Sequence, residues 1–411
     1  MSEALHLRCS DPACAATLDA RDNPLACPRC GGLLDVVVPM PQADPRALRR
    51  TWSDRRRSND ALDASGVWRF REFLPAYPPS AIVSLREGNT ALVDARHVSA
   101  RSRVARLFFK HLGWNPTGSF KDTGMTVGIT EAKRAGATRV ACASTGNTAA
   151  SMAAFAARAG LPARAYLPRG AVSGAKLAQA IDYGAEIVEV DGNFDAALAR
   201  LVAGAGTGEY FVNSLNPFRL EGQKTVVFEL LDQLQWSPPD FIVLPGGNLG
   251  NVSAFGKAIE ELVASGLIVK RPRLVVVQAE GANPFARLWR AGGTVLQPHR
   301  DPQTEATAIR IGAPASWKKA LRALRFTGGF ALDVSEDAIR EAKAAIGREG
   351  IGCEPASATT LAAVEQLSAD GRIDRDATVV AILTGHVLKD PDYIIRHRPV
   401  GHLGSGTLGT V

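Results

Sequence analysis

A single lysine, Lys121, stands in a sequence context that suits covalent chemistry. It follows a Gly/Ser turn in the run NPTGSFKD, residues 115–122, and precedes a stretch rich in alanine and glycine that is typical of a helix. A lysine at a helix start lies near the positive end of the helix dipole, which disfavours its protonated form. The neutral amine can attack an aldehyde, so the sequence predicts a Schiff-base lysine. An ordinary solvated lysine is the alternative.

A glycine-rich loop further along the chain has the composition of a phosphate site. The segment PGGNLGN follows an apolar strand and precedes a helical segment. Glycines there let backbone amides converge on a phosphate, and the helix dipole adds positive potential. We predict that the phosphate-binding residues are Gly246, Gly247, Asn248, Leu249, Gly250 and Asn251. A plain strand-to-helix turn is the alternative.

A second turn, STGNT at residues 144–148, also lies between a strand end and a helix. Its hydroxyls and backbone amides form an anion-accepting surface that suits an α-carboxylate. Simple capping of the helix by Thr145 or Asn147 is the alternative. Both uses draw on the same amides, so they can hold at different stages.

Two further segments carry polar side chains at strand ends. NSLNPFR, residues 213–219, places Arg219 just after a strand, and a guanidinium suits a phosphate ester. LTGH, residues 383–386, ends the last predicted buried strand, at the carboxyl edge where α/β sites form. A surface salt bridge is the alternative for Arg219, and we favour a structural hydrogen bond for His386.

The cysteines near the start of the chain have metal-ligand spacing. A CxxxxC pair and a CxxC pair are separated by a short loop, and two such knuckles can place four thiolates around zinc. Gly31 and Gly32 after the second pair free backbone amides that turn toward the sulfurs, whereas no glycine follows the first pair directly. We predict a zinc-ribbon-like segment with the ligands Cys9, Cys14, Cys27 and Cys30. A ribbon without metal is the alternative.

The ordered motifs resemble those of one enzyme family. NPTGSFKD, STGNT, PGGNLGN and LTGHVLKD are accompanied by SLREGNT, NSLNPFRLEGQKT, VQAEGANP, ATAIRIG and GIGCEPASA. The set is similar to threonine synthases, which are pyridoxal 5'-phosphate (PLP) enzymes of the tryptophan-synthase-β type, and it runs from residue 66 to residue 390. The resemblance implies PLP as cofactor and the conversion of O-phosphohomoserine and water to threonine and phosphate.

The resemblance also implies roles by position. Lys121 would bond the cofactor aldehyde, the GGNLGN loop would hold the cofactor phosphate, and Asn147 would bond the phenolic oxygen of the ring. Thr384 would face the ring nitrogen. A neutral hydroxyl cannot stabilise a protonated ring nitrogen as a carboxylate would, so the ring would withdraw electrons less strongly. The remaining matches concern the substrate: Ser144, Thr145 and Thr148 for its carboxylate, and Arg219, Asn213 and Ser214 for its phosphate.

Departures and alternatives accompany this resemblance. Leu112 stands where the family usually has an acid and Thr123 where it usually has arginine, so we expect altered packing around the site. Another lyase of the same cofactor class is the runner-up, such as a threonine dehydratase or a cysteate synthase.

Six arginines between Arg46 and Arg57 could bind phosphate polymers. Trp52 is the only aromatic among them, so we favour a solvated helix face and no nucleic-acid partner.

Composition places the chain among ordinary globular proteins. It has 411 residues, 46% hydrophobic and 22% charged, and its length predicts two to three domains. The net charge of +7 fits an enzyme for a phosphorylated substrate. The chain start lacks a basic region followed by an apolar segment, and no stretch offers about 18 apolar residues. We expect a cytoplasmic protein with no membrane partner; the oligomeric state stays open, with a homodimer among the options.

Alternating strands and helices predict an α/β fold with two parallel-sheet domains and the active site between them. Strands are predicted at residues 103–110, 139–143, 163–167, 186–190, 241–244, 274–278 and 378–383. Helices are predicted after residue 120 and at residues 148–159, 176–183 and 194–203. We assign residues 1–40 to the ribbon, 41–99 and 216–411 to a large PLP-binding domain, and 100–215 to a smaller domain.

Overall fold

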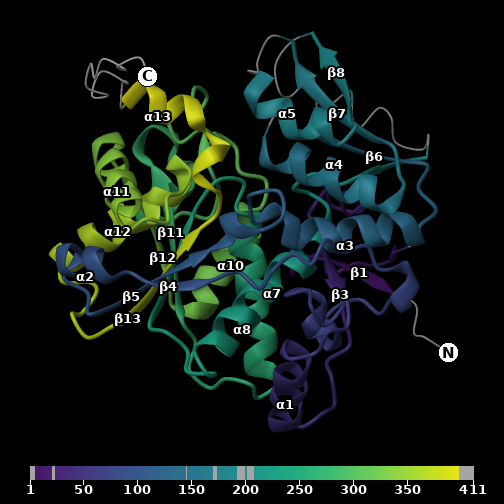
Figure 1. Ribbon diagram of the computed structural model, residues 1–411, viewed down its shortest axis with the longest axis horizontal. Helices are drawn as coiled ribbons and strands as arrows, with labels where there is room; N and C mark the ends of the chain where they lie inside the picture. Colours follow the sequence, from purple (N-terminus) through teal and green to yellow (C-terminus); the bar gives the residue numbers. More distant parts are fainter. Residues whose placement is uncertain are drawn as a thin grey trace, which may run out of the picture.

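Three β-sheets organise the chain (Figure 1). The computed structural model describes residues 5–20, 24–144, 146–169, 174–191, 200 and 208–397. Helices flank the two larger sheets, and the smallest sheet lies near the amino terminus. The predicted α/β fold is confirmed.

The largest sheet has six strands in the order β12-β11-β10-β13-β5-β4, and only β4 is antiparallel to its neighbour. Its strands are β4 (Leu92–Asp94), β5 (Arg106–His111), β10 (Phe241–Pro245), β11 (Arg273–Ala279), β12 (Phe330–Val334) and β13 (Thr378–Leu383). Along β10, Phe241 and Val243 join one hydrophobic cluster and Ile242 and Leu244 join another. Strands that are apolar on both sides are typical of a parallel sheet with both faces covered.

Two groups of helices provide that cover. The first cluster includes residues of α2 (Arg96–Ser102), α11 (Glu336–Arg348) and α12 (Pro355–Ala369). The second includes residues of α1 (Pro45–Arg56), α7 (Pro217–Gln233), α8 (Gly250–Ala264), α9 (Pro284–Arg290) and α10 (Trp317–Thr327). A short helix, α13 (Pro391–His397), follows β13.

The second sheet is fully parallel, in the order β8-β7-β6-β9. Its strands are β6 (Arg139–Ala143), β7 (Ala163–Pro168), β8 (Glu186–Val190) and β9 (Glu209–Phe211). One core joins its strands to α3 (Lys121–Arg134), α4 (Asn147–Ala159) and α5 (Gly174–Asp182). The carboxyl ends of β6 and β13 lead into STGNT and LTGH, so each sheet contributes one predicted site loop.

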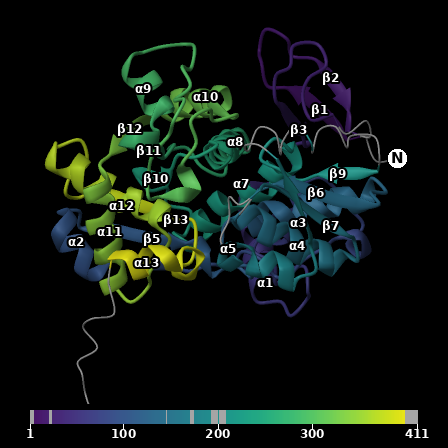
Figure 2. The same cartoon turned by 90° about the horizontal axis from the view of Figure 1, so that it is seen from above.

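The amino-terminal sheet is antiparallel, in the order β2-β1-β3, and its strands are β1 (His6–Cys9), β2 (Thr17–Asp19) and β3 (Leu34–Val37). Buried ionic contacts dock β3 on α8 and α10. Lys319 Nζ donates to Leu34 O and to Asp35 Oδ1, both at 2.6 Å, and Lys257 Nζ donates to Val36 O at 2.8 Å. Burial raises the pKa of Asp35, but the nearby cations outweigh it and lower the pKa to about 2. This sheet is therefore anchored to two of the helices that cover the largest sheet (Figure 2).

The arginine-rich segment forms α1. Trp52 is fully buried and packs edge-on against Phe70, so it cannot stack on a nucleic-acid base. Arg55 Nη1 donates to Glu72 Oε2 at 2.9 Å, which uses one guanidinium within the protein. Arg57 stays largely exposed.

Most predicted strands are confirmed to within one residue at each end. The strand predicted from residue 103 begins instead at Arg106, because Arg103 ends α2 with a left-handed φ of 57°. In the two larger sheets, β4 and β12 were not predicted, and β9 is the strand expected before NSLNPFR, for which no bounds were predicted. Apart from residue 200, the helix predicted at 194–203 lies outside the described residues.

One boundary of the predicted division into domains is wrong. The boundary at residue 100 places β5 in the smaller domain, yet β5 pairs with β13 and β4 in the six-stranded sheet. The reason is that Leu107 and Phe109 are fully buried in the core of that sheet. The rest of the division stays a prediction. Among the helices of the described residues, none has the length and apolar content needed to cross a membrane.

Glycines let α3 and α7 approach each other closely. A Cβ atom on Gly222 of α7 would lie 1.9 Å from Thr123 O of α3, and one on Gly124 would lie 2.7 Å from Arg219 O. Either side chain would therefore collide with a backbone carbonyl. The helix that begins at Lys121 is held at its position by this contact.

We expect Gly222→Ala to destabilise the protein by roughly 3 kcal/mol, because overpacking against backbone cannot be relieved by a rotamer change. The measurement is chemical denaturation of the variant and the wild type. The matched control is Gly347→Ala in α11, where a Cβ would meet nothing within 4 Å. This control should be neutral or up to about 1 kcal/mol more stable. Equal stability of the two variants would contradict the close α3–α7 packing.

Candidate active site

Backbone hydrogen bonds fix the turn before Lys121 to the end of β13. The Phe120 N–H donates to Thr384 O and the His386 N–H donates to Gly118 O, both at 2.9 Å. Gly118 has a φ of 84°, a conformation that favours glycine. Ligand sites in α/β sheets form at the carboxyl ends of the strands. The pairing therefore brings Lys121 to the edge of the larger sheet where a site is expected.

A buried carboxylate, Asp122, anchors the same turn. It accepts hydrogen bonds from the Thr117 N–H at 2.7 Å, from Thr117 Oγ1 at 2.6 Å and from Ser151 Oγ at 2.6 Å. Desolvation raises its pKa, while these donors favour the charged form. Since Ser151 belongs to α4, one carboxylate ties together the turn, α3 and α4.

The amine of Lys121 lies in a cationic and desolvated environment. Lys121 is the first residue of α3 and is partly buried. Desolvation, reinforced by the charge of Arg219 and opposed by that of Glu354, lowers the pKa of Lys121 from 10.5 to about 7. At neutral pH a large fraction of the amine is unprotonated, which is the form that attacks an aldehyde.

The GGNLGN loop joins β10 to α8. Leu249 is the N-cap, with a left-handed φ of 63°, and no described side chain caps the helix. The first backbone N–H groups of α8 are thus available to an anion. A Cβ on Gly246 would lie 2.7 Å from Val276 Cγ1, so only glycine fits there. The amide of Asn251 is buried and finds no hydrogen-bond partner within the described chain, as expected of a group that meets a ligand.

Asn248 connects this loop to the NSLNPFR segment. Its Nδ2 donates to Ser214 Oγ at 2.9 Å, and its Oδ1 accepts from the Ala315 N–H at 2.9 Å. Asn213 Oδ1 accepts from the Leu215 N–H at 3.0 Å and shapes the turn before α7. The two segments predicted to bind phosphate groups are therefore in direct contact.

Arg219 is buried in the first turn of α7. Its Nη1 donates to Val212 O at 3.2 Å, and its Nε has no partner among the described residues. Desolvation lowers the pKa of Arg219 to about 10. The alternative of a surface salt bridge is wrong, because the side chain is almost completely buried. A buried guanidinium with an unused donor suits an anionic ligand.

Asn147 and Thr384 meet through a residue to which the sequence analysis assigned no role. Glu354 Oε1 accepts from Thr384 Oγ1 at 2.9 Å, and Glu354 Oε2 accepts from Asn147 Nδ2 at 3.0 Å. Glu354 is buried and directly precedes α12. It lies in the motif GIGCEPASA. The sequence feature that could have pointed to Glu354 is an acidic residue directly before a helix. One carboxylate thus links the two residues predicted to contact the cofactor ring.

The STGNT loop is described except for Thr145, which lies outside the described residues. Ser144 and Thr148 are partly buried, and Gly146 is the N-cap of α4. Asn147 bonds the carboxylate described above and does not cap the helix. The capping alternative is therefore wrong for Asn147.

Two residues that follow Thr384 shape the edge of the site. His386 Nδ1 accepts from the Leu388 N–H at 3.2 Å, which agrees with a structural role. Lys389 Nζ donates to Thr117 O at 2.9 Å and also contacts Gln179 of α5. Lys389 therefore connects the turn before α3 to the smaller sheet, a role that the sequence analysis did not predict.

The departures from the family pattern are packing positions. Leu112 is fully buried in the core shared with α7 and α8. Thr123 Oγ1 donates to Phe120 O at 2.8 Å within the first turn of α3. Both residues support the turn that carries Lys121.

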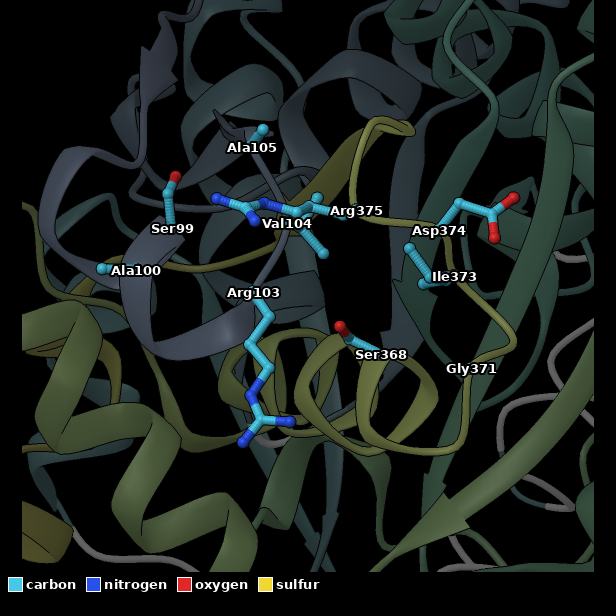
Figure 3. Close-up of a pocket in the computed structure, with 10 residues that line it drawn as sticks. All are labelled: Ser99, Ala100, Arg103, Val104, Ala105, Ser368, Gly371, Ile373, Asp374 and Arg375. Carbon is cyan, nitrogen blue, oxygen red and sulfur yellow. The ribbon is translucent and has the colours of Figure 1, made fainter.

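A cavity of about 660 Å³ lies away from these residues, at the amino ends of β5 and β13 (Figure 3). Its lining includes Ser99, Arg103, Ser368 and Arg375. We place the candidate site at the opposite, carboxyl edge of the sheet, because the unpaired polar groups of Arg219 and Asn251 and the perturbed amine of Lys121 lie there.

The cysteines of the amino-terminal sheet form one cluster. The sulfur atoms of Cys9, Cys14, Cys27 and Cys30 all lie within 4.8 Å of one another. Cys9 Sγ is 3.4 Å from Cys30 Sγ, and Cys14 Sγ is 3.7 Å from Cys27 Sγ. A tetrahedral site with Zn–S bonds of about 2.3 Å needs S–S separations of about 3.8 Å. The Gly32 N–H also donates to Cys30 Sγ at 3.4 Å. Because the sulfur atoms are about as far apart as zinc requires, the cluster fits zinc.

Comparisons with known proteins agree with this geometry. The profile of the family described as pyridoxal-phosphate dependent enzyme matches residues 83–385. Threonine synthase of Methanocaldococcus jannaschii is 44% identical over 385 residues, 93% of each chain. Threonine synthase of Methanosarcina acetivorans is 42% identical over 393 residues, 95% of this chain and 93% of that protein.

Solved structures share the fold. Threonine synthase from Escherichia coli has a TM-score of 0.71 at 18% identity, covering 95% of this chain and 90% of that chain. Threonine deaminase isoform 2 from Solanum lycopersicum has a TM-score of 0.64 at 18% identity, covering 85% of this chain and 87% of that chain. The family match and the 42–44% identity over almost the whole length decide the relationship. The chain belongs to the threonine synthase family of pyridoxal-phosphate dependent enzymes.

Proposed function

We propose that this chain converts O-phosphohomoserine and water to threonine and phosphate, with PLP as cofactor. The observation that carries the proposal is the buried, partly unpaired guanidinium of Arg219, whose charge acts on the amine of Lys121. A covalent lysine beside a guanidinium suits an amino-acid substrate that carries a phosphate ester. Two relatives described as threonine synthase, 42–44% identical over most of the chain, support the assignment.

The described residues fit the cofactor. The GGNLGN loop and the free amides at the start of α8 would hold its phosphate, and Asn251 supplies an additional buried amide. Asn147 and Thr384 would contact the ring. When bound, PLP withdraws electrons from the substrate carbons near its attachment point.

Lys121 would act as base and acid toward the bound substrate. A pKa of about 7 lets its Nζ take a proton from the α or β carbon and return it near neutral pH. Arg219, supported by Asn213 and Ser214, would bind the substrate phosphate as it leaves. Ser144, Thr145 and Thr148 of the STGNT segment would bind the substrate carboxylate.

We expect a cytoplasmic enzyme that does not bind nucleic acid, and a homodimer among the assemblies allowed. The zinc site is likewise proposed, with a structural role. Because Lys257 and Lys319 dock β3 on α8 and α10, metal at the cysteine cluster would stabilise the ribbon and this contact.

The reaction is tested with purified protein and PLP. We expect release of phosphate and threonine from O-phosphohomoserine and little phosphate from phosphoserine. The side chain of phosphoserine is one carbon shorter, so its phosphate would not reach the position that suits O-phosphohomoserine. Coupled detection of phosphate and chromatographic detection of threonine provide the measurement. Phosphate from phosphoserine alone would favour a cysteate synthase, and ammonia from threonine alone would favour a dehydratase.

Covalent attachment of PLP should depend on pH through Lys121. With a pKa of about 7 in place of 10.5, the amine loses its proton between about pH 6 and 8, so the attachment rate should rise over this range and then level off. Stopped-flow absorbance after mixing apoprotein with PLP measures the rate. Lys121→Ala should give no borohydride-trapped adduct, whereas the exposed Lys133→Ala on the same helix should behave as wild type. A rate that still climbs tenfold per pH unit above pH 8 would exclude the lowered pKa.

Zinc content tests the cysteine cluster. The wild-type protein should hold one zinc ion per chain, and Cys27→Ser with Cys30→Ser should hold none and unfold at lower temperature, because metal binding stabilises the fold that contains the site. Elemental analysis and thermal unfolding measure both effects. Cys142→Ala, a change at a buried cysteine outside the cluster, should retain the metal. Metal-free wild-type protein from zinc-supplemented cells, with unfolding insensitive to chelator, would support a ribbon without metal.

A further inference from the structure

The amino-terminal sheet packs against both helices that carry Lys121 and Arg219 (Figure 1). Its hydrophobic cluster includes Leu34 and Val36 of β3. The same cluster includes Phe218 of α7 and Val127 of α3, and all of these side chains are buried. The sheet is therefore in contact with the two helices of the candidate site.

The next residue of each helix belongs to the contact that places the guanidinium. Arg219 directly follows Phe218, and Gly128 directly follows Val127. The stem of Arg219 lies along Gly128, since a Cβ on this glycine would be 3.1 Å from Arg219 Cγ. The residues that meet the amino-terminal sheet are thus chain neighbours of those that place the guanidinium.

The two ends of α7 pack into different cores. Val226, Phe228 and Leu231 belong to the cluster on one face of the largest sheet. Phe218, in the first turn, belongs instead to the cluster of the amino-terminal sheet. Because Arg219 lies in that first turn, its part of the helix depends on the amino-terminal sheet for packing.

A buried ammonium connects β3 to the start of α7. Lys257 Nζ of α8 donates to Val36 O at 2.8 Å and also contacts the carboxylate of Glu221. Glu221 is buried and stands two positions after Arg219. One side chain therefore joins the backbone of β3 to the helix start that carries the guanidinium.

Few contacts fix the direction of the Arg219 side chain itself. No carboxylate among the described residues forms an ion pair with it. Its Nη1 donates to Val212 O at 3.2 Å, and its Nε is unpaired in the described part of the chain. The place of the guanidinium therefore depends on where the first turn of α7 lies.

We propose that the amino-terminal sheet positions Arg219 for a phosphate group, with Lys257 as a positioning residue. The inference rests on the proposed binding of the substrate phosphate by Arg219. When the contact is lost, the first turn of α7 can shift, and a binding group displaced by less than about 1 Å loses much of its effect. The ligand is a phosphate dianion, as the ester of an amino acid or as inorganic phosphate.

Other contacts hold Lys121. The Phe120 N–H donates to Thr384 O, and Asp122 accepts from Ser151 Oγ of α4. Neither contact involves the amino-terminal sheet. We therefore expect a disturbed sheet to weaken phosphate binding while cofactor attachment at Lys121 is retained.

Lys257→Met tests the ionic contact, because methionine keeps an unbranched side chain and cannot donate to Val36 O or Glu221. PLP-loaded protein is titrated with inorganic phosphate in a calorimeter. We expect roughly tenfold weaker binding than in the wild type. The control Lys270→Met, which removes an exposed lysine paired with Asp240, should bind as the wild type does. Arg219→Met should show no phosphate binding.

Steady-state kinetics separate positioning from a general loss of structure. In Lys257→Met, KM for O-phosphohomoserine should rise by a factor similar to the loss of phosphate affinity. The value of kcat should change less than about threefold, as for a contact made equally before and during the reaction.

Val36→Ala tests the apolar contact and keeps the carbonyl that Lys257 binds. Its matched control is Val334→Ala in β12, a similarly buried valine of a different hydrophobic cluster. Both variants should unfold at lower temperature, because each loses two carbon atoms from a core. Only Val36→Ala should bind phosphate more weakly.

The outcomes distinguish this inference from the proposed function. Phosphate binding of wild-type strength in Lys257→Met and Val36→Ala, or equal weakening in Val334→Ala, would overturn the inference and leave the proposed function intact. Wild-type affinity in Arg219→Met would overturn both. Protein that binds phosphate through Arg219 but releases no threonine would overturn the proposed function alone. Val36→Ala decides the point if Lys257→Met does not fold.

Discussion

The active site depends on the short backbone pairing between the turn at residues 115–120 and the end of β13. Two hydrogen bonds of 2.9 Å and the bridge between Ser119 and Gly385 join these segments. Space for the pairing is limited: a Cβ on Gly113 would lie 2.4 Å from His386 N. The turn leads into α3, which packs in the core of the smaller sheet, whereas β13 is central to the larger one. Lys121 and Thr384, which we propose bond the cofactor and face its ring, are therefore neighbours because of main-chain geometry.

Helix α7 is the second element on which the site depends, because it packs against α3, α8 and β3. Its first turn carries Arg219, and its glycine at position 222 allows close contact with α3. One turn further along, Lys224 is fully buried and pairs with Glu221 at 2.6 Å. Glu221 also contacts Lys257, which holds the backbone of β3. Breaking such a buried ionic network is costly, so these contacts hold the ribbon on α7 and α8, and α7 in turn packs against α3.

The positive charges of the site favour anionic ligands. Arg219 and Lys121 repel each other in a desolvated environment, and both have lowered pKa values. The charge of Glu354 opposes this effect and raises the pKa of Lys121. A cofactor phosphate at the start of α8 and a substrate phosphate at Arg219 would each add negative charge where positive potential is unopposed. The unpaired amide of Asn251 and the unpaired Nε of Arg219 agree with that picture.

The sequence by itself determined the α/β class, most strands and the chemistry of the motifs, because apolar alternation and glycine-rich turns are local signals. It did not reveal that β5 belongs to the larger sheet, since pairing with β13 is a contact between residues more than two hundred positions apart. Nor could it assign Glu354, because an acid before a proline has no evident partner until folding brings Asn147 and Thr384 to it. Residue types and spacing established what each motif can bind. Only the tertiary structure decided which motifs and helices meet, because such contacts join residues that are far apart in the sequence.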